Sequence, residues 1–256
     1  MRLRIWRSDP TTDEPGSFGE YEIDTFPDMV VLDAVLAIQR SLVPDLAVRW
    51  NCKAGRCGSC SAEVNGRPVL MCTTPLSLYE NEEALTITPL RTFPLVKDIV
   101  TDPSRAYEAA RRVPPFQPDP NGALGAAEVE RQRELRKCIE CFLCQDVCHV
   151  LRDQKLYRQF VGPRHLLHAA SLELHPLDAL DRRKPVQETL GLGYCNVTRC
   201  CTDVCPEGIR ITDDAIIPLK ERLADRSDPL RWVWDRLSPP RKRRALPVLP
   251  SDDPDE

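Results

Sequence analysis

The first hundred residues alternate between strand-like patterns and one amphipathic helix. Apolar and polar residues alternate along residues 3–7, and residues 21–25 read as the partner strand, with a connection rich in Thr, Asp, Pro and Gly at residues 10–19. Residues 30–42 carry apolar side chains at helical spacing, with Asp33 in the first turn, where the helix dipole favours an acid. Strands at 61–64 and 69–72 flank the hairpin signal Asn65-Gly66, and residues 85–88 predict another strand. We therefore expect a small α+β domain over residues 1–105.

Helical patterns dominate the second half of the chain. They cover residues 106–112, 127–137, 163–174 and 212–223, the last with Thr212 as a plausible N-cap. Four prolines and two glycines lie within residues 113–125, so residues 106–125 are expected to form a Pro-rich linker. A helical domain is then predicted over residues 126–235, followed by a charged tail over residues 236–256.

Composition narrows the class of protein. The hydrophobic fraction of 42% and charged fraction of 29% are those of a soluble globular protein, and a net charge of -4 gives no case for nucleic-acid binding. Residues 1–10 have no apolar core, so no secretory signal is expected, and no stretch approaches 18 apolar residues. Twelve cysteines without an export signal favour metal binding over a disulfide framework.

The first cysteines have the plant-type spacing of a [2Fe-2S] centre: Cys52, Cys57, Cys60 and Cys72. Such a loop must wrap over two irons with its amides facing the sulfurs, which needs small residues, here Ala54, Gly55, Gly58 and Ser59. Cys72 is expected to come from outside the loop, on the strand after the hairpin turn. A structural zinc site is the alternative, but zinc usually takes two separated cysteine pairs.

The other two groups of cysteines are copies of one spacing. Cys138, Cys141, Cys144 and Cys148 form the C-x2-C-x2-C-x3-C run of bacterial ferredoxins. Cys195, Cys201 and Cys205 repeat it, with Thr198 in place of the second cysteine. In two-cluster ferredoxins the last cysteine of each run binds the other cluster. This rule predicts a [4Fe-4S] cluster on Cys138, Cys141, Cys144 and Cys205, and a [3Fe-4S] cluster on Cys148, Cys195 and Cys201, whose vacant corner faces Thr198.

Several residues stand outside this assignment. Cys200 is expected to be a small, partly buried side chain that points away from the cluster, with occupation of the vacant corner as the alternative. His149 follows Cys148, but the run has one residue too many for c-type haem attachment. The remaining histidines are expected to be surface or interhelical residues: His165, His168 and His175. The basic run at residues 239–244 is expected to be a solvated terminus, or else to contact anionic lipid or an acidic partner.

The order of these motifs resembles the iron–sulfur subunit of succinate dehydrogenases and fumarate reductases. The resemblance covers roughly residues 2–225 and rests on the segment 52–60, Cys72, the runs 138–148 and 195–206, and an expected linker entry at 94–100. It implies a β-grasp plant-type [2Fe-2S] ferredoxin domain followed by an all-α, bacterial-ferredoxin-like domain with two clusters. It also implies single-electron transfer from FAD in a flavoprotein subunit, through the [2Fe-2S], [4Fe-4S] and [3Fe-4S] clusters, to quinone at membrane-anchor subunits. The chain itself would have no substrate site and would lie peripherally on the cytoplasmic face of the inner (plasma) membrane.

Two positions depart from the family pattern. Many members have Pro after the cysteine that matches Cys148 and then a Trp that hydrogen-bonds quinone, whereas His149 stands here and residues 150–153 contain no Trp. The His that often follows the cysteine matching Cys195 is Asn196. We therefore expect quinone to be contacted mainly by the anchor, or electrons to leave to a further redox centre there.

Three other functions remain as alternatives to succinate oxidation. They are fumarate reduction, a free-standing polyferredoxin carrier, or a subunit of another complex, such as a 2-hydroxy-acid oxidase or a heterodisulfide-reductase-like enzyme.

Overall fold

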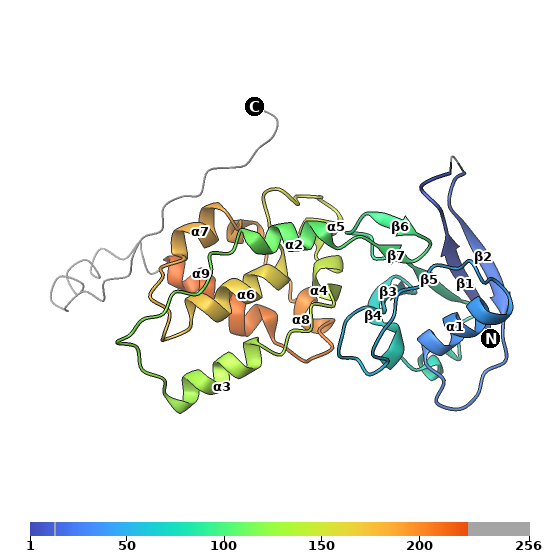
Figure 1. Cartoon of the computed structure of the whole chain (residues 1–256), viewed down its shortest axis with the longest axis horizontal. Helices are drawn as coiled ribbons and strands as arrows, with labels where there is room; N and C mark the ends of the chain where they lie inside the picture. Colours follow the sequence, from blue (N-terminus) through green and yellow to red (C-terminus); the bar gives the residue numbers. More distant parts are fainter. Residues whose placement is uncertain (13, 225–256) are drawn as a thin grey trace.

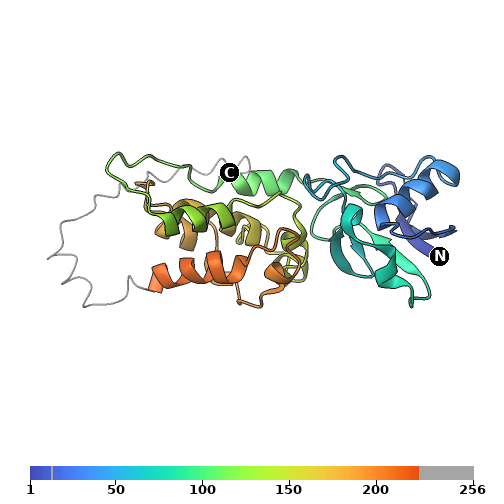
Figure 2. The same ribbon diagram turned by 90° about the horizontal axis from the view of Figure 1, so that it is seen from below.

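The molecule is elongated, with a lobe that contains a β-sheet at one end and a helical lobe at the other (Figures 1 and 2). The computed structural model describes residues 1–12 and 14–224. The predicted tail at 236–256 and the basic run at 239–244 lie outside the described residues. The α+β fold class is confirmed.

The N-terminal lobe is a five-stranded mixed sheet with strand order β2-β1-β5-β3-β4. Its strands are β1 (Arg2–Arg7), β2 (Ser17–Glu22), β3 (Ser61–Val64), β4 (Arg67–Leu70) and β5 (Leu85–Thr88). Strand β1 pairs antiparallel with β2 and parallel with β5. Helix α1 (Val31–Ser41) buries its apolar stripe in the same core as Leu3 and Ile5 of β1. The alternating pattern of β1 and the helical pattern of α1 therefore face one core.

Two details of this lobe differ from the sequence prediction. The second strand begins at Ser17 rather than residue 21, because the β1–β2 register pairs Leu3 with Tyr21 and continues to Trp6 opposite Phe18. The Trp6 and Phe18 rings pack edge to face, 5.2 Å apart. Cys72 does not lie on a strand: β4 ends at Leu70, and the chain turns through the 3₁₀ helix η1 (Met71–Thr73).

A short ribbon and a helix lead from the first lobe to the second. The ribbon pairs β6 (Leu95–Lys97) with β7 (Val100–Thr101), and helix α2 (Ser104–Arg111) occupies the start of the segment predicted as linker. The prolines that follow are held by Arg182, whose guanidinium donates hydrogen bonds to the carbonyl oxygens of Pro114 and Pro115. Arg182 is fully buried and pairs with the buried Asp178 at 2.8 Å. The linker is thus fastened to the helical lobe.

The helical lobe packs short helices around the buried α6 (Pro163–Glu173). The others are α3 (Ala126–Leu135), α4 (Leu143–Asp146), α5 (His149–Arg152), α7 (Arg183–Glu188), η3 (Leu192–Tyr194), α8 (Cys200–Asp203), η4 (Ile211–Ile216) and α9 (Ile217–Ala224). His165 and His175 are buried, which favours the interhelical interpretation over the surface one for these two. Among the described residues, no helix has the length and apolar character needed to cross a membrane.

Thr212 is not the N-cap that the sequence suggested. Arg210 precedes η4, a π-helical turn, and makes no side-chain cap. Thr212 lies inside this turn with 1% of its surface exposed, its backbone N–H donating to the Thr202 hydroxyl at 3.0 Å. Its own hydroxyl lies 3.4 Å from the sulfur of Cys201. The hydroxyl therefore faces a cysteine instead of capping the helix.

Candidate metal centres

The loop that carries the first three cysteines directs backbone amides at sulfur. The N–H groups of Ala54 and Arg56 donate to Cys52 Sγ at 3.4 and 3.3 Å. Gly58 has φ +68°, and a Cβ atom at this position would lie 2.6 Å from Cys141 Cα. A side chain is therefore excluded by both backbone conformation and space. This close approach brings the first cysteine loop into contact with the second cysteine group.

The four thiols of the first group have different surroundings. Cys60 and Cys72 are buried, and burial together with the neighbouring Cys72 thiol raises the pKa of Cys60 to about 12. Burial opposes ionisation of Cys57 too, but hydrogen bonds involving Ser59 and Cys52 outweigh it and lower the pKa of Cys57 to about 6. Cys52 is exposed. The first centre thus opens toward the surface of the N-terminal lobe.

The second group joins residues from both cysteine runs. Burial raises the pKa of Cys144 well above its usual value, and the charges of Cys141 and Cys138 add to this effect. Burial likewise raises the pKa of Cys141 to about 12, with further contributions from Cys138 and Cys205. Cys205, which is 61 residues beyond Cys144 in the numbering, acts electrostatically on the other three thiols of the group. Cys205 thus lies near the three thiols with which the crossed rule groups it, and Cys144 is also close to Cys201 of the third group.

The third group contains one thiol more than the sequence assignment. Burial raises the pKa of Cys148 to about 12 and that of Cys201 to about 11, and in both cases the charges of Cys200 and Cys195 raise it further. Cys200 Sγ lies 3.3 Å from the hydroxyl of Thr198, the residue predicted to face the vacant corner. Cys200 therefore lies beside the residue that was predicted to face the vacant corner.

The two cysteine runs repeat one backbone shape. In each run the residues two and four positions after the first cysteine have positive φ: Glu140 (56°), Phe142 (61°), Val197 (59°) and Arg199 (64°). In each run a short helix, α4 or α8, begins five positions after that cysteine. The repeat found in the spacing of the cysteines is therefore also a repeat in three dimensions, and Thr198 occupies the place of Cys141.

These donor sets fit iron–sulfur clusters. All twelve thiols are free. In the part of the chain that the structure describes, no three His, Cys, Asp or Glu side chains converge closely enough to hold a single metal ion. Cluster ligands bond to different irons, so their sulfurs need not meet at one point. Thiols grouped in this way, with backbone amides directed at Cys52 Sγ, suit cluster binding.

Polar side chains join the two lobes next to the second group. Ser61 donates through its hydroxyl to the carbonyl oxygens of Gly58 and Cys141, at 2.8 and 2.9 Å. The fully buried Glu63 on β3 pairs with Arg91 at 2.9 Å and with Arg152 of α5 at 3.1 Å. Burial, with the facing Asp146 carboxyl as the next cause, raises the pKa of Glu63 to about 7. Glu63 is a charged residue between apolar residues of a predicted strand, and this was a sequence signal that it has a buried partner. Which residues are its partners could not be predicted from the sequence.

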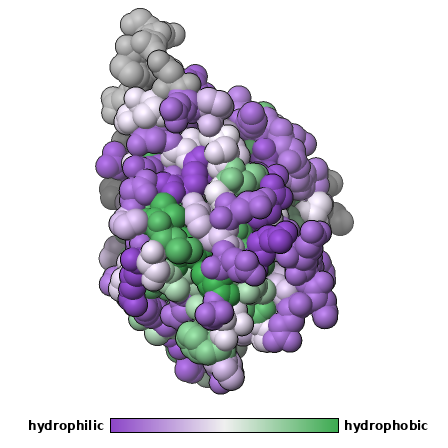
Figure 3. All heavy atoms as spheres, turned by 90° about the vertical axis from the view of Figure 1, so that its right-hand side faces the viewer, coloured by the Kyte–Doolittle hydropathy of each residue, from purple (hydrophilic) through white to green (hydrophobic). Residues whose placement is uncertain are grey.

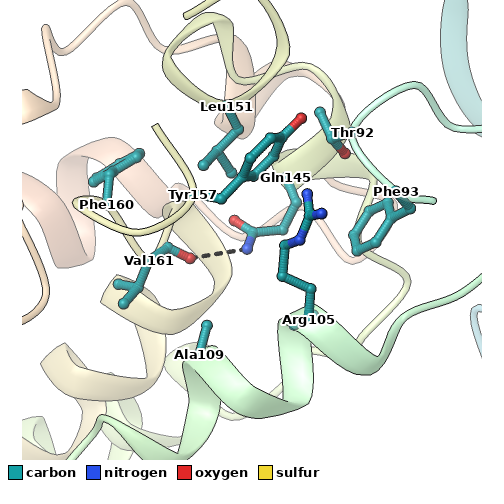
Figure 4. Close-up of a pocket in the computed structure, with 10 residues that line it drawn as sticks. Thr92, Phe93, Arg105, Ala109, Gln145, Leu151, Tyr157, Phe160 and Val161 are labelled. Atoms are coloured by element: carbon teal, nitrogen blue, oxygen red, sulfur yellow. Dashed lines mark hydrogen bonds between the residues drawn. The ribbon is translucent and has the colours of Figure 1, made fainter. Parts of the chain in front are cut away.

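A shallow pocket lies at the junction of the lobes, shown in Figure 4. It is bordered by Thr92 and Phe93 after the sheet, Arg105 of α2, and Gln145 of α4 (Figure 4). Gln145 stands between two cysteines of the first run and donates a hydrogen bond to the Val161 carbonyl oxygen at 2.9 Å. This contact anchors the segment that carries thiols of both the second and third groups.

The residues that depart from the family pattern contact each other. Asn196 Nδ2 and His149 Nε2 lie 3.2 Å apart. Asn196 is exposed and His149 is half-buried. They border the third group, since each follows one of its cysteines directly.

The fold and these sites define a two-domain protein of the ferredoxin type. Residues 2–108 match the family described as a 2Fe-2S iron–sulfur cluster binding domain, and residues 134–209 match the 4Fe-4S dicluster domain. The chain thus combines a [2Fe-2S] domain with a domain for two further clusters.

Its relatives narrow this class to one family. The chain is 30% identical over 229 residues to the succinate dehydrogenase iron–sulfur subunit of Bacillus subtilis, covering 83% of this chain and 88% of that protein. It is 29% identical over 223 residues to one chain of the fumarate reductase (CoM/CoB) of Methanothermobacter marburgensis, covering 86% of this chain but only 44% of that longer protein. A chain of the Mycobacterium smegmatis Sdh1 complex in the apo form is similar in structure, with 52% identity, a TM-score of 0.84, and coverage of 90% of this chain and 98% of that one.

The chain belongs to the family of iron–sulfur subunits of succinate dehydrogenases and fumarate reductases. The resemblance found in the sequence is therefore confirmed, together with the electron-transfer role and the iron–sulfur cofactors that it implied.

Proposed function

We propose that this chain is the electron-transfer subunit of a membrane-bound succinate:quinone oxidoreductase, positioned between a flavoprotein subunit with FAD and membrane-anchor subunits. The proposed ligands are Cys52, Cys57, Cys60 and Cys72 for [2Fe-2S]; Cys138, Cys141, Cys144 and Cys205 for [4Fe-4S]; and Cys148, Cys195 and Cys201 for [3Fe-4S]. The proposed domain borders are those expected from the sequence, at residues 105 and 125.

The observation that carries this proposal is that the three thiol groups form one continuous series. Gly58 of the first loop touches Cys141 of the second group. Cys144 of the second group is within electrostatic reach of Cys201 of the third. Such a series suits transfer from one end of the chain to the other.

When bound, each cluster accepts and releases single electrons. The residues of the chain hold and tune these centres. Cys144, Cys148 and Cys201 are buried, so these three sulfurs of the inner two sites are shielded from water. Their burial raises the pKa of each thiol, so cluster insertion must release protons from them to solvent. Ser61 and Gly58 fix the approach of the first loop to the second site.

Exposed apolar residues on the N-terminal lobe favour the binding of a partner subunit to this lobe. Large apolar side chains there are exposed: Phe26, Leu42, Trp50 and Leu78. Figure 3 views this end of the molecule, where apolar areas interrupt a polar surface. Exposed apolar residues mark interaction surfaces when they gather. We assign this end to the flavoprotein, because the exposed first centre lies in this lobe.

The third site is assigned to the anchor, on the cytoplasmic face of the membrane. Its border carries His149 and Asn196 in place of the residues that often contact quinone in this family. We therefore propose that quinone is contacted mainly by anchor subunits, or that a further redox centre in the anchor receives the electrons.

Purification of the complex through a tag on this chain tests the proposal. We expect co-purification of a flavin-containing subunit and a membrane-spanning subunit. EPR spectra of the complex should show three clusters, and the spectra should change when succinate is added as the electron donor. A chain that purifies alone as a stable, cluster-loaded monomer would instead indicate a free-standing carrier. A complex that reduces fumarate from quinol faster than it oxidises succinate would assign it to fumarate reduction.

A further inference from the structure

The third thiol site has a corner that the repeat leaves without a cysteine. The two runs share their backbone shape, with left-handed residues at Val197 and Arg199 matching Glu140 and Phe142. Thr198 therefore stands where Cys141 stands in the first run. A neutral hydroxyl is a poor ligand for iron in such a cluster, so the corner lacks a thiolate from Thr198 itself.

Cys200 supplies a thiol beside this corner. Its Sγ atom lies 3.3 Å from the Thr198 hydroxyl. This contact places the Cys200 sulfur beside the position that the repeat leaves without a thiolate.

The side chain of Cys200 is not committed to packing elsewhere. Its counterpart in the first run is Leu143, which is 1% exposed and belongs to the apolar core of the N-terminal lobe. Cys200 is half-buried instead, and α8 begins at this residue immediately after the left-handed Arg199. Cys200 and Cys201 are successive residues of α8, so their side chains leave the helix about 100° apart, and the Cys200 side chain lies on the side of Thr198.

We propose that Cys200 is a fourth thiol ligand of the third site, which lets a [3Fe-4S] cluster there take up a fourth iron under reducing conditions. This inference rests on the proposed ligand set of Cys148, Cys195 and Cys201. It makes the third site a centre whose iron content depends on redox state and iron supply, rather than one fixed at three irons.

The step balances in electrons, iron and protons. A one-electron reductant converts [3Fe-4S]⁺ to [3Fe-4S]⁰. One Fe²⁺ ion then adds to give [4Fe-4S]²⁺, with the four sulfides unchanged. The Cys200 thiol loses its proton to solvent, and its sulfur forms the bond to the added iron. Dithionite and a ferrous salt are the reductant and the iron source.

The test uses the purified full complex with its clusters in place. The oxidised complex is incubated anaerobically with dithionite and ⁵⁷Fe²⁺, freed of excess iron, and examined by EPR after mild reoxidation and by Mössbauer spectroscopy. We expect the wild-type complex to lose most of its [3Fe-4S]⁺ EPR signal and to gain ⁵⁷Fe in a cubane cluster. The Cys200→Ala complex should keep the [3Fe-4S]⁺ signal and incorporate no ⁵⁷Fe at this site.

Two further variants guard against indirect effects. Thr198→Cys in the Cys200→Ala background restores a thiol at the position equivalent to Cys141 and should restore iron uptake. Thr198→Val retains Cys200 and should take up iron as the wild type does. Should Cys200→Ala fail to assemble, Cys200→Ser provides the same comparison, since its hydroxyl, like that of Thr198, binds cluster iron poorly.

Each result decides between the proposals. Equal ⁵⁷Fe uptake by wild-type and Cys200→Ala complexes would exclude Cys200 as the acceptor. No uptake by the wild type, with the [3Fe-4S]⁺ signal intact, would overturn this inference and leave the proposed function standing. A wild-type complex with no [3Fe-4S]⁺ signal before treatment and no fourth iron to release on oxidation would overturn the proposed cluster content itself.

Discussion

The two cysteine runs of the helical lobe share a backbone but differ in what surrounds them. The first run is buried against the N-terminal lobe, whose core includes Cys141 and Leu143. In the second run the equivalent positions are the exposed Thr198 and the half-buried Cys200. A repeated spacing therefore sets a repeated chain path, whereas the neighbouring lobe determines which run is sealed from solvent. The contrast suits a relay that receives electrons on one side and releases them on the other.

The largest expected effect comes from replacing the last cysteine of either run. Cys148→Ser should abolish the [3Fe-4S] signal and spare the [4Fe-4S] cluster, because the crossed rule assigns Cys148 to the third group, and the thiols that raise its pKa are those of Cys200 and Cys195. Cys205→Ser is the matched variant and should damage the [4Fe-4S] cluster first. EPR spectra of both oxidised and reduced complexes provide the measurement. Loss of the [4Fe-4S] signal alone in Cys148→Ser would show that each run holds its own cluster.

A second comparison uses one glycine beside each run. Gly58→Ala adds a Cβ that meets Cys141 Cα at 2.6 Å with φ at +68°, so we expect a loss of about 3 kcal/mol from backbone strain and overpacking. Gly208 follows the second run with φ +65°, and a Cβ atom there would meet nothing within 4 Å. Gly208→Ala should therefore cost only about 1 kcal/mol. Urea unfolding of the cluster-loaded protein measures both, and equal losses would show that the contact between the loops contributes little.

The pH dependence of the unfolding free energy should show the effect of Glu63, a buried carboxyl close to the first run. Burial and the Asp146 carboxyl raise the pKa of Glu63 from its ordinary 4.5 to about 7. The stabilisation from protonated Glu63 is complete below pH 4.5 and is lost as the pH rises through about 7, because the folded state binds the proton more tightly. Glu63→Gln, which stays neutral, should remove this loss of up to about 3 kcal/mol.

Urea midpoints on either side of this pH window provide the measurement. Glu20→Gln, at an exposed pair with Arg4, is the control and should leave the pH profile parallel to that of the wild type. A Glu63→Gln profile that also runs parallel to the wild type would mean that Glu63 is already ionised in the folded protein, held by Arg91 and Arg152.

The smallest expected effect concerns a hydroxyl beside the second run. Thr212 Oγ1 lies 3.4 Å from Cys201 Sγ in a buried position. Hydrogen bonds to cluster sulfur raise the reduction potential. Thr212→Val removes a bond worth about 1 kcal/mol, which corresponds to a fall on the order of 40 mV for one electron. Redox titration of the third cluster measures the shift, with Ser171→Ala on α6 as a control that should leave it unchanged.

Much of the architecture was readable from the chain. The periodicity of residues 30–42 predicted α1, and Asn65-Gly66 predicted the β3–β4 hairpin, because local backbone preference and one buried face specify both. The second strand was misplaced because its register depends on pairing with β1, including the contact of Trp6 with Phe18. Thr212 was mistaken for a cap because its actual neighbour, Cys201, is eleven residues away along the chain.

The sequence by itself determined the kinds of cluster that this protein can hold, since the spacing of cysteines along one loop limits which irons that loop can reach. It also determined the repeat between the two runs and, through the resemblance they carry, the family. Only the tertiary structure decided that Gly58 meets Cys141, that Glu63 pairs with Arg152, and that the sulfur of Cys200 lies beside Thr198. The first two contacts join residues distant along the chain, and the third depends on a local left-handed turn, so all three follow from packing and backbone path rather than from spacing.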